Sequence, residues 1–122
     1  MQVEEVDFVQ IPTRDVRRAA EWYRDMLGLP ISPSTTRDAE VDPPNVTLRF
    51  WKPEDVGVEF QPNLSGIALR VPDVEAARKE LEAKGVEFMA PTYDTNVCLM
   101  AFFRDLDGNV LILHRRYAPR AQ

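Results

Sequence analysis

An internal repeat constrains this chain most, because two stretches of its sequence follow the same pattern. Residues 6–29 (VDFVQIPTRDVRRAAEWYRDMLGL) and residues 65–88 (SGIALRVPDVEAARKELEAKGVEF) each show an alternating strand, an Asp, an amphipathic helix and a Gly. When the two stretches are aligned, Asp15 falls on Asp73. A repeat of this length indicates two copies of one supersecondary unit. A seam between half-domains is a common binding place for a small molecule, so the repeat also suggests where function resides.

Hydrophobic periodicity predicts the same elements in both copies. In the first copy, residues 4–11 alternate as a strand does, Asp15 is a good helix N-cap, and Gly28 ends the helix. In the second copy, Asp73 is the cap and Gly85 is the stop. The further predicted strands are residues 30–35 and 45–51 in the first half, separated by a polar segment at 36–44, and residues 86–93, 97–104 and 110–116 in the second. The second half therefore reads strand–helix–strand–strand–strand, and from the repeat we expect the same pattern for the first half.

Length and composition favour a single soluble domain. At 122 residues the chain has room for one domain, and its net charge of −5 argues against a nucleic-acid partner. No apolar run approaches the ~20 residues of a membrane span, so no membrane association is expected. The N-terminus is acidic and enters a strand at once, unlike a signal peptide, and the single Cys98 fits a reducing compartment. We therefore expect a cytoplasmic location.

Several motifs together resemble the vicinal oxygen chelate superfamily, which includes glyoxalase I, bleomycin-resistance binding proteins, fosfomycin-resistance enzymes and extradiol dioxygenases. They are the βαβββ repeat, the D-V-x-x-A start of both helices, W-Y-R-D-M-L-G-L at the end of the first helix, and F-F-R-D-L-D-G-N-V-L before the last strand. The resemblance covers residues 5–116. It implies an α+β fold in which two βαβββ modules form a cupped eight-stranded mixed sheet with helices on the outer face.

The same resemblance implies a domain organisation and an assembly. Residues 1–122 would form one glyoxalase-like domain, with module one at 4–51, a linker at 52–65 and module two at 66–116. Members of the superfamily often complete their cleft with a partner chain, and each module has open strand edges that need covering. We therefore expect a homodimer.

Four positions of the resemblance carry metal ligands in the superfamily's enzymes, usually His, Glu, His and Glu. These positions fall here on Phe8, Thr47, Gly66 and Ile112. Phe, Gly and Ile have no side-chain donor atom, and Thr alone is a poor ligand, whereas a divalent metal needs converging imidazole or carboxylate donors. We therefore expect no metal at these positions, no other cofactor, and no chemistry that depends on a Lewis acid there.

Strand parity extends the candidate site, because residues two apart in a strand point the same way. If the four positions face a cleft, their neighbours two and four residues along face it too. The candidate ligand-binding residues are then Phe8, Gln10, Thr47, Arg49, Trp51, Arg70, Ile112 and His114. Buried charge is costly unless it is paired, so inward arginines favour an anionic ligand, and the aromatic side chains favour a ligand with an aromatic part.

Structural roles stay open for these residues. Arg49 and Arg70 could reach solvent from strand ends, or pair with Glu40 or Glu59, and the aromatic side chains could serve only packing. Trp22 and Tyr23 lie on the helix stripe and are predicted to be core.

Two classes of function follow from this reading, with binding favoured over catalysis. The first is a metal-free small-molecule binding protein of the bleomycin-resistance type. The second is a metal-independent lyase or isomerase that uses His114, the only histidine, as acid or base, because imidazole exchanges protons near neutral pH. A glyoxalase-like metalloenzyme with a relocated site, using for example Glu59, and a domain without ligand are further alternatives. No catalytic residue is assigned beyond His114 as the best candidate.

Overall fold

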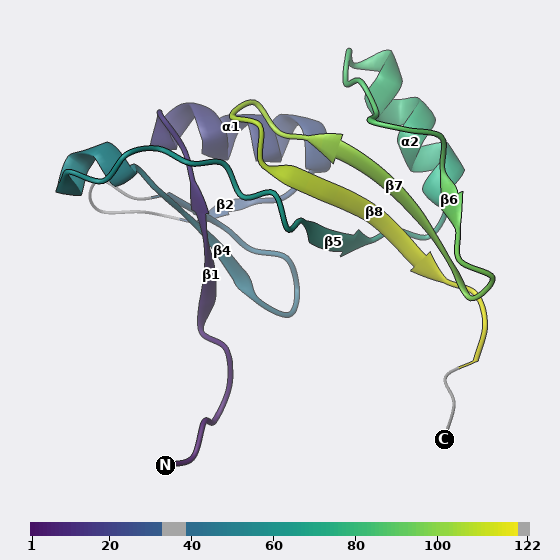
Figure 1. Ribbon diagram of the computed structural model, residues 1–122, viewed down its shortest axis with the longest axis horizontal. Helices are drawn as coiled ribbons and strands as arrows, with labels where there is room; N and C mark the ends of the chain where they lie inside the picture. Colours follow the sequence, from purple (N-terminus) through teal and green to yellow (C-terminus); the bar gives the residue numbers. More distant parts are fainter. Residues whose placement is uncertain (33–38, 120–122) are drawn as a thin grey trace. The chain divides into compact units, whose positions relative to one another are not determined.

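The computed structural model describes residues 1–32 and 39–119, and its elements follow the predicted order in each half. The chain divides into two compact units, unit one (Met1–Pro62) and unit two (Asn63–Gln122). Each unit holds a βαβββ set with one four-stranded mixed sheet, which confirms the α+β class and the two modules (Figure 1). None of the helices in the described ranges is both long enough and apolar enough to cross a bilayer.

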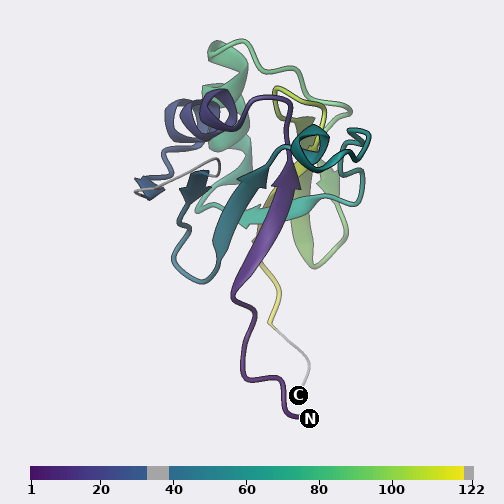
Figure 2. The same cartoon turned by 90° about the vertical axis from the view of Figure 1, so that its left-hand side faces the viewer.

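Unit one begins with an edge strand and an amphipathic helix. Its elements are β1 (Phe8–Pro12), α1 (Val16–Leu27), β2 (Ile31–Ser32), β3 (Ala39–Val41), β4 (Thr47–Trp51) and a short 3-10 helix, η1 (Pro53–Val56). The sheet order is β1-β4-β3-β2, with β1 parallel to β4 and the other pairs antiparallel (Figure 2 shows β1 beside β4). β3 and η1 were not predicted, since they lie in the polar segment and in the linker. Residues 33–38, which the prediction divided between a strand and that segment, lie outside the described residues.

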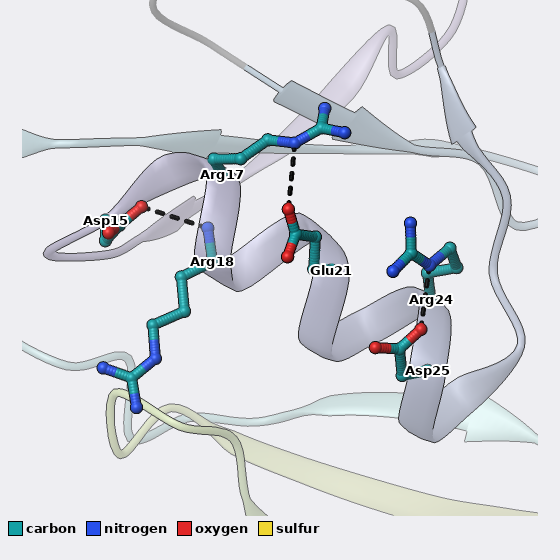
Figure 3. A network of polar contacts seen from close by, with 6 residues as sticks. All are labelled: Asp15, Arg17, Arg18, Glu21, Arg24 and Asp25. Carbon is teal, nitrogen blue, oxygen red and sulfur yellow. Dashed lines mark hydrogen bonds and ion pairs between the residues drawn. The ribbon is translucent and has the colours of Figure 1, made fainter.

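Both ends of α1 are capped as the sequence predicts. The Asp15 side chain accepts a hydrogen bond from the backbone N–H of Arg18 at 3.0 Å, and Gly28 takes the left-handed conformation (φ 70°) that ends the helix. The outer face carries an exposed pair between Arg17 and Glu21, with Nε and Oε1 3.1 Å apart (Figure 3). Exposed pairs of this kind contribute little to stability, so the helix depends on its buried face.

The core of unit one lies between α1 and one face of the sheet. Tyr23 and Phe50 are fully buried, and their rings meet edge-on with centroids 4.7 Å apart. Ile11 and Leu48, on the same face of the sheet as Phe50, are each 1% exposed. Trp22, which was predicted to be core, is only half-buried and packs its edge against Tyr23.

Unit two repeats this arrangement with longer strands. Its elements are β5 (Ile67–Arg70), α2 (Val74–Ala83), β6 (Tyr93–Asp94), β7 (Cys98–Arg104) and β8 (Val110–Arg116). The sheet order is β5-β8-β7-β6, with β5 parallel to β8. α2 packs against β7 and β8 (Figure 1), and the sheet face beneath it holds the fully buried Leu111 and Phe103.

One predicted boundary in unit two is confirmed and another is wrong. α2 ends at Ala83 with Lys84 as its cap, and Gly85 (φ 93°) follows and stops the helix as predicted, with its backbone N–H donating to the carbonyl of Glu82. The predicted strand at 86–93 is mostly irregular: Phe88 forms one isolated bridge with Phe103, and only Tyr93 belongs to β6. Pro91 lies in this segment and has no N–H to donate to a strand ladder.

The predicted turn between β7 and β8 is held by a buried polar network. The carboxylate of Asp105, which is 7% exposed, accepts hydrogen bonds from the backbone N–H groups of Asp107 and Asn109 at 2.8 and 3.0 Å. The amide of Asn109, 2% exposed, donates to Asp105 at 2.9 Å and accepts from the backbone N–H of Asn63 at 2.8 Å. This turn therefore fastens the start of unit two to β8.

A second polar contact, at the end of unit two, makes a pH-dependent contribution to stability. The hydroxyl of Tyr117 donates to Asp94 Oδ1 at 2.7 Å. This hydrogen bond, followed by one from the backbone N–H of Asn96, lowers the pKa of Asp94. The bond to Asp94, followed by desolvation and charge repulsion, raises the pKa of Tyr117.

We expect the stabilisation from this contact to be confined to a window of pH. A lowered carboxyl pKa stabilises the fold above the unfolded value of about 3.9, and the effect is lost as pH falls through the folded value. A raised tyrosine pKa stabilises the fold below about 10, and the effect is lost as pH rises through the folded value. The melting temperature of Tyr117→Phe should fall below that of the parent near neutral pH, and the difference should shrink as the pH falls below about 3.9. Tyr93→Phe, at another exposed tyrosine, is the control, and an equal difference for Tyr117→Phe at every pH would contradict the assignment.

Candidate functional site

The open face of unit one, which is the sheet face turned away from α1, carries all five candidate residues of that unit. Phe8 lies opposite Thr47 in the register of β1 and β4, Gln10 lies opposite Arg49, and Trp51 follows two residues later. The structure therefore places these side chains on one surface, opposite to the buried face of Phe50.

Arg49 is engaged within its own unit. Its guanidinium donates to the Oε1 of Gln10 and lies 5.5 Å from the ring centroid of Phe8, in a cation–π arrangement. Glu40 is its register partner on the other side, in β3. The guanidinium of Arg49 therefore already has a hydrogen-bond acceptor and an aromatic ring as partners within unit one, with a carboxylate residue at the neighbouring register position.

Thr47 is also committed to a local contact. Its hydroxyl donates to Asp42 Oδ1 at 2.9 Å, and Asp42 accepts a further hydrogen bond from Ser32. Trp51 is half-buried and lies opposite Pro12 in the register, so this end of the open face is apolar.

The open face of unit two, turned away from α2, holds a row of side chains that crosses all four strands. Arg70 lies opposite His114, His114 lies opposite Met100, and Met100 lies opposite Tyr93. We call these residues the Arg70 row. In the next row Ala68 lies opposite Ile112, and Ile112 lies opposite Phe102.

Strand parity could have revealed part of the Arg70 row from sequence. Met100 is two residues from Phe102 in the predicted strand 97–104, so the alternation that identified His114 could also have identified Met100. Alternation could not have identified Tyr93, because β6 does not follow the predicted boundaries of its strand.

The charge on the open face of unit two has one sign. Its charged strand residues are Arg70, Arg104 and Arg116, and no strand residue on this face is an Asp or Glu, although the whole chain carries −5. Arg116 donates to the backbone carbonyls of Ala118 and Pro119 at 2.8 and 3.0 Å. Within residues 63–119, the side chains of Arg70 and His114 make no hydrogen bond or ion pair.

The four positions that hold a metal in the superfamily's enzymes do not fit one here. Gly66 has φ 89°, and a Cβ built on it would lie 3.0 Å from Ile112 Cδ1 and 3.3 Å from Val110 Cγ1. An aliphatic side chain therefore fills the space that a ligand at residue 66 would need. Phe8 and Ile112 have no side-chain donor atoms, so neither position can supply a metal ligand.

The registers identify which residue of β4 corresponds to Ile112. Gln10 aligns with Ala68 in the repeat, and their strand partners are Arg49 and Ile112. Arg49 is therefore the counterpart of Ile112, and Thr47 lies opposite Phe8 instead. Neither Arg49 nor Thr47 is a carboxylate, so the mismatch with a metal holds for both assignments.

The structure also locates the residues of the relocated-site alternative. His114 belongs to β8 of unit two, and Glu59 is an exposed residue that follows η1 in unit one. Across residues 1–32 and 39–119, no three His, Cys, Asp or Glu side chains are grouped as metal ligands would be. Cys98 is buried, with its Sγ 3.1 Å from the hydroxyl of Thr95.

Solved structures share the fold of this chain. TnmS3, described as an antibiotic binding protein from Streptomyces sp. CB03234, matches with a TM-score of 0.81 and 24% identity, over 96% of this chain and 99% of that one. A superfamily member from Sphaerobacter thermophilus DSM 20745 matches with a TM-score of 0.80 and 24% identity, over 92% and 97%. Lactoylglutathione lyase from Agrobacterium tumefaciens matches with a TM-score of 0.75 and 16% identity, over 93% and 94%.

Sequence comparison gives the family. No curated protein matches the chain significantly. The family model described as "Glyoxalase/Bleomycin resistance protein/Dioxygenase superfamily" matches residues 5–113, which is most of the chain and includes both sheets. The chain therefore belongs to the glyoxalase/bleomycin resistance protein/dioxygenase superfamily.

Proposed function

We propose that this protein is a metal-free small-molecule binding protein of the glyoxalase and bleomycin-resistance type, with an anionic ligand that has an aromatic part. One observation carries the proposal. The positions of the superfamily's metal ligands hold Phe8, Thr47, Gly66 and Ile112, while neighbouring positions on the same sheet faces hold arginine and aromatic side chains. The description of TnmS3 as antibiotic-binding supports a binding role by likeness of fold.

The chemistry of the open faces favours this ligand class. An arginine offers a planar fork of N–H donors that matches a carboxylate or phosphate, and charge-assisted bonds of this kind are among the stronger ones in proteins. Aromatic side chains such as Trp51 and Phe8 offer large apolar areas against which a planar group can pack. A cationic drug would meet Arg70 unfavourably, so the proposal does not extend to cationic ligands.

One observation favours catalysis as a second candidate. The imidazole of His114 makes no hydrogen bond within the described part of unit two, so it is available to move a proton. A metal-independent lyase or isomerase would use it as acid or base. Such an activity should disappear in His114→Gln, with thermal melts establishing that the variant is folded.

Native mass spectrometry against a metabolite extract tests the two functions. A binding protein should retain one intact small molecule per chain, with the same mass in the extract before and after incubation. An enzyme should deplete one compound and produce another. If nothing is retained and nothing is turned over in extracts from several growth conditions, both functions are wrong.

The donor set predicts the outcome of metal analysis. Purified protein should carry Ni, Zn, Fe or Mn at well below one ion per chain, and a chelator should leave its melting temperature unchanged, because the four positions lack ligands. Elemental analysis and thermal melts measure both quantities. A near-stoichiometric ion that is lost in His114→Ala or Glu59→Ala would instead establish a relocated metal site.

The sheet edges predict a homodimer. β1 and β5 each lie at the end of a four-stranded sheet, so each has one side without a strand partner in its own sheet. Such edges are commonly covered in native proteins, and a second copy of the chain is the partner we propose. Light scattering should then give about twice the 14.0 kDa of the chain. A mass of one chain at micromolar concentration would contradict the proposal.

A further inference from the structure

We infer that the open face of unit two is the anion-binding part of the ligand site, with Arg70 and His114 as the anchor for a carboxylate or phosphate group. The inference rests on the proposed function, and it selects one of the two arginines that sequence alone left equivalent. It also assigns Met100 and Tyr93, the remainder of the Arg70 row, to the apolar body of the ligand.

The two anchor side chains lie next to each other on the sheet of unit two. Arg70 and His114 are register partners on parallel neighbouring strands and point to the same face. Neighbouring strands lie about 4.8 Å apart, so a guanidinium and an imidazole in this arrangement can both reach one anionic group. Arg70 is exposed and His114 is half-buried, which leaves the pair accessible from the open side within unit two.

Arg49 and Arg70 differ in how far neighbouring groups compensate their charge. Arg49 donates to Gln10, stacks on Phe8 and has Glu40 as its strand neighbour. Arg70 has no such compensation within residues 63–119, because its neighbours along the row are His114, Met100 and Tyr93. An arriving anion would share Arg49 with its existing contacts, whereas it would supply a partner that Arg70 lacks within residues 63–119.

The two copies of the repeat differ at the anchor positions. Arg70 and His114 occupy the positions that Pro12 and Trp51 occupy in unit one. One row away, Ala68 and Ile112 of unit two occupy the positions of Gln10 and Arg49. Unit two therefore has a polar pair where unit one has an apolar pair, and the reverse holds one row away. The shared pattern of the repeat does not account for the Arg70–His114 pair.

The composition of the row indicates the class of ligand. The guanidinium of Arg70 gives two parallel N–H donors, which suit a carboxylate or a phosphate monoester. The thioether of Met100 and the exposed ring of Tyr93 suit an apolar or aromatic body attached to that group. An aromatic carboxylate or an aryl phosphate combines both features.

Titration with matched probes tests the anchor. The probes are 1-naphthoate, 1-naphthyl phosphate and the neutral 1-naphthylmethanol, added to full-length 15N-labelled protein and followed by NMR. We expect both anions to bind more tightly than the alcohol and to shift the side-chain signals of Arg70 and His114. The relative affinities of the two anions identify whether the anchor prefers carboxylate or phosphate.

Three arginine variants separate the anchor from general electrostatics. Arg70→Met should weaken anion binding roughly tenfold to a hundredfold, as expected for loss of a charged hydrogen-bonding partner. Arg49→Met, in unit one, and Arg104→Met, on the same face as Arg70, should each change it by less than about threefold. Arg70→Lys keeps the charge without the fork and should give an intermediate loss. Thermal melts establish that each variant is folded.

The possible failures are distinguishable. If Arg49→Met or Arg104→Met weakens binding as much as Arg70→Met, the anchor is assigned wrongly, while the proposed function stands. If the parent binds neither anion but retains a neutral metabolite in native mass spectrometry, the anion-binding inference alone is wrong. If it binds no probe and retains no metabolite, the inference and the proposed function fail together.

Discussion

Replacing Phe50 with alanine should lower the free energy of unfolding by about 3–5 kcal/mol, the usual cost of a buried Phe→Ala change. Phe50 is fully buried, and its ring meets that of Tyr23 with centroids 4.7 Å apart. The substitution removes both the apolar area and the aromatic contact that joins α1 to the sheet. Because small domains are stable by only about 5–15 kcal/mol, this one change should remove a large part of the total. Urea unfolding followed by circular dichroism measures the loss.

Phe8→Ala is the matched control for this prediction. Phe8 belongs to the same sheet but lies on its open face and is 46% exposed. Its loss should cost less than about 1 kcal/mol, since much of its surface already meets water. Equal losses for Phe8→Ala and Phe50→Ala would show that the two faces of the sheet are assigned wrongly.

Asn109→Ala should cost about 2–4 kcal/mol, because it removes one donor from the buried carboxylate of Asp105 and the acceptor of the part-buried Asn63 N–H. The Asn109 amide accepts from the backbone N–H of Asn63 and donates to the carboxylate of Asp105. Asp105 is 7% exposed, so water cannot readily replace the lost donor. Chemical unfolding measures the change in free energy, and hydrogen exchange at Asn63 reports the local loosening.

Asn45→Ala provides the comparison for the buried asparagine. Asn45 is exposed in the turn before β4, and its truncation should change stability by less than about 0.5 kcal/mol. A loss of similar size in Asn109→Ala would mean that the network at the β7–β8 turn adds nothing beyond an ordinary surface turn.

Local sequence signals predict the repeated elements well. Asp15, Asp73 and Gly28 have the cap roles that their types suggest, because capping depends on groups within one turn of the helix. The strand at 110–116 has the observed bounds, since it is a buried run that follows a strong turn signal. β3 was missed because its three residues, Ala39–Val41, are too few to show periodicity and gain their pairing from β4.

From the sequence, the candidate site could be predicted only as a set of residues that share one face of a sheet. Alternation within a strand identified which residues share a face with Phe8 or His114. It could not distinguish Arg49 from Arg70, because the contacts of Arg49 with Gln10 and Phe8 depend on which strands are neighbours and in which register. The same limit applied to Ile112, whose side chain lies close to Gly66, the residue before β5, because β5 pairs with β8.

The backbone at Gly66 affects how sequences of this kind can change. Its φ of 89° suits glycine, and any side chain placed there would also meet Ile112 and Val110. A histidine at residue 66 would therefore be unfavourable until the neighbouring aliphatic side chains had become smaller and the local backbone had changed. Each of those earlier steps would loosen a buried part of β8 without yet providing a complete set of ligands. Recovery of a metal site through residue 66 would thus require several mutations in a particular order, with the early ones costing stability and bringing no new activity.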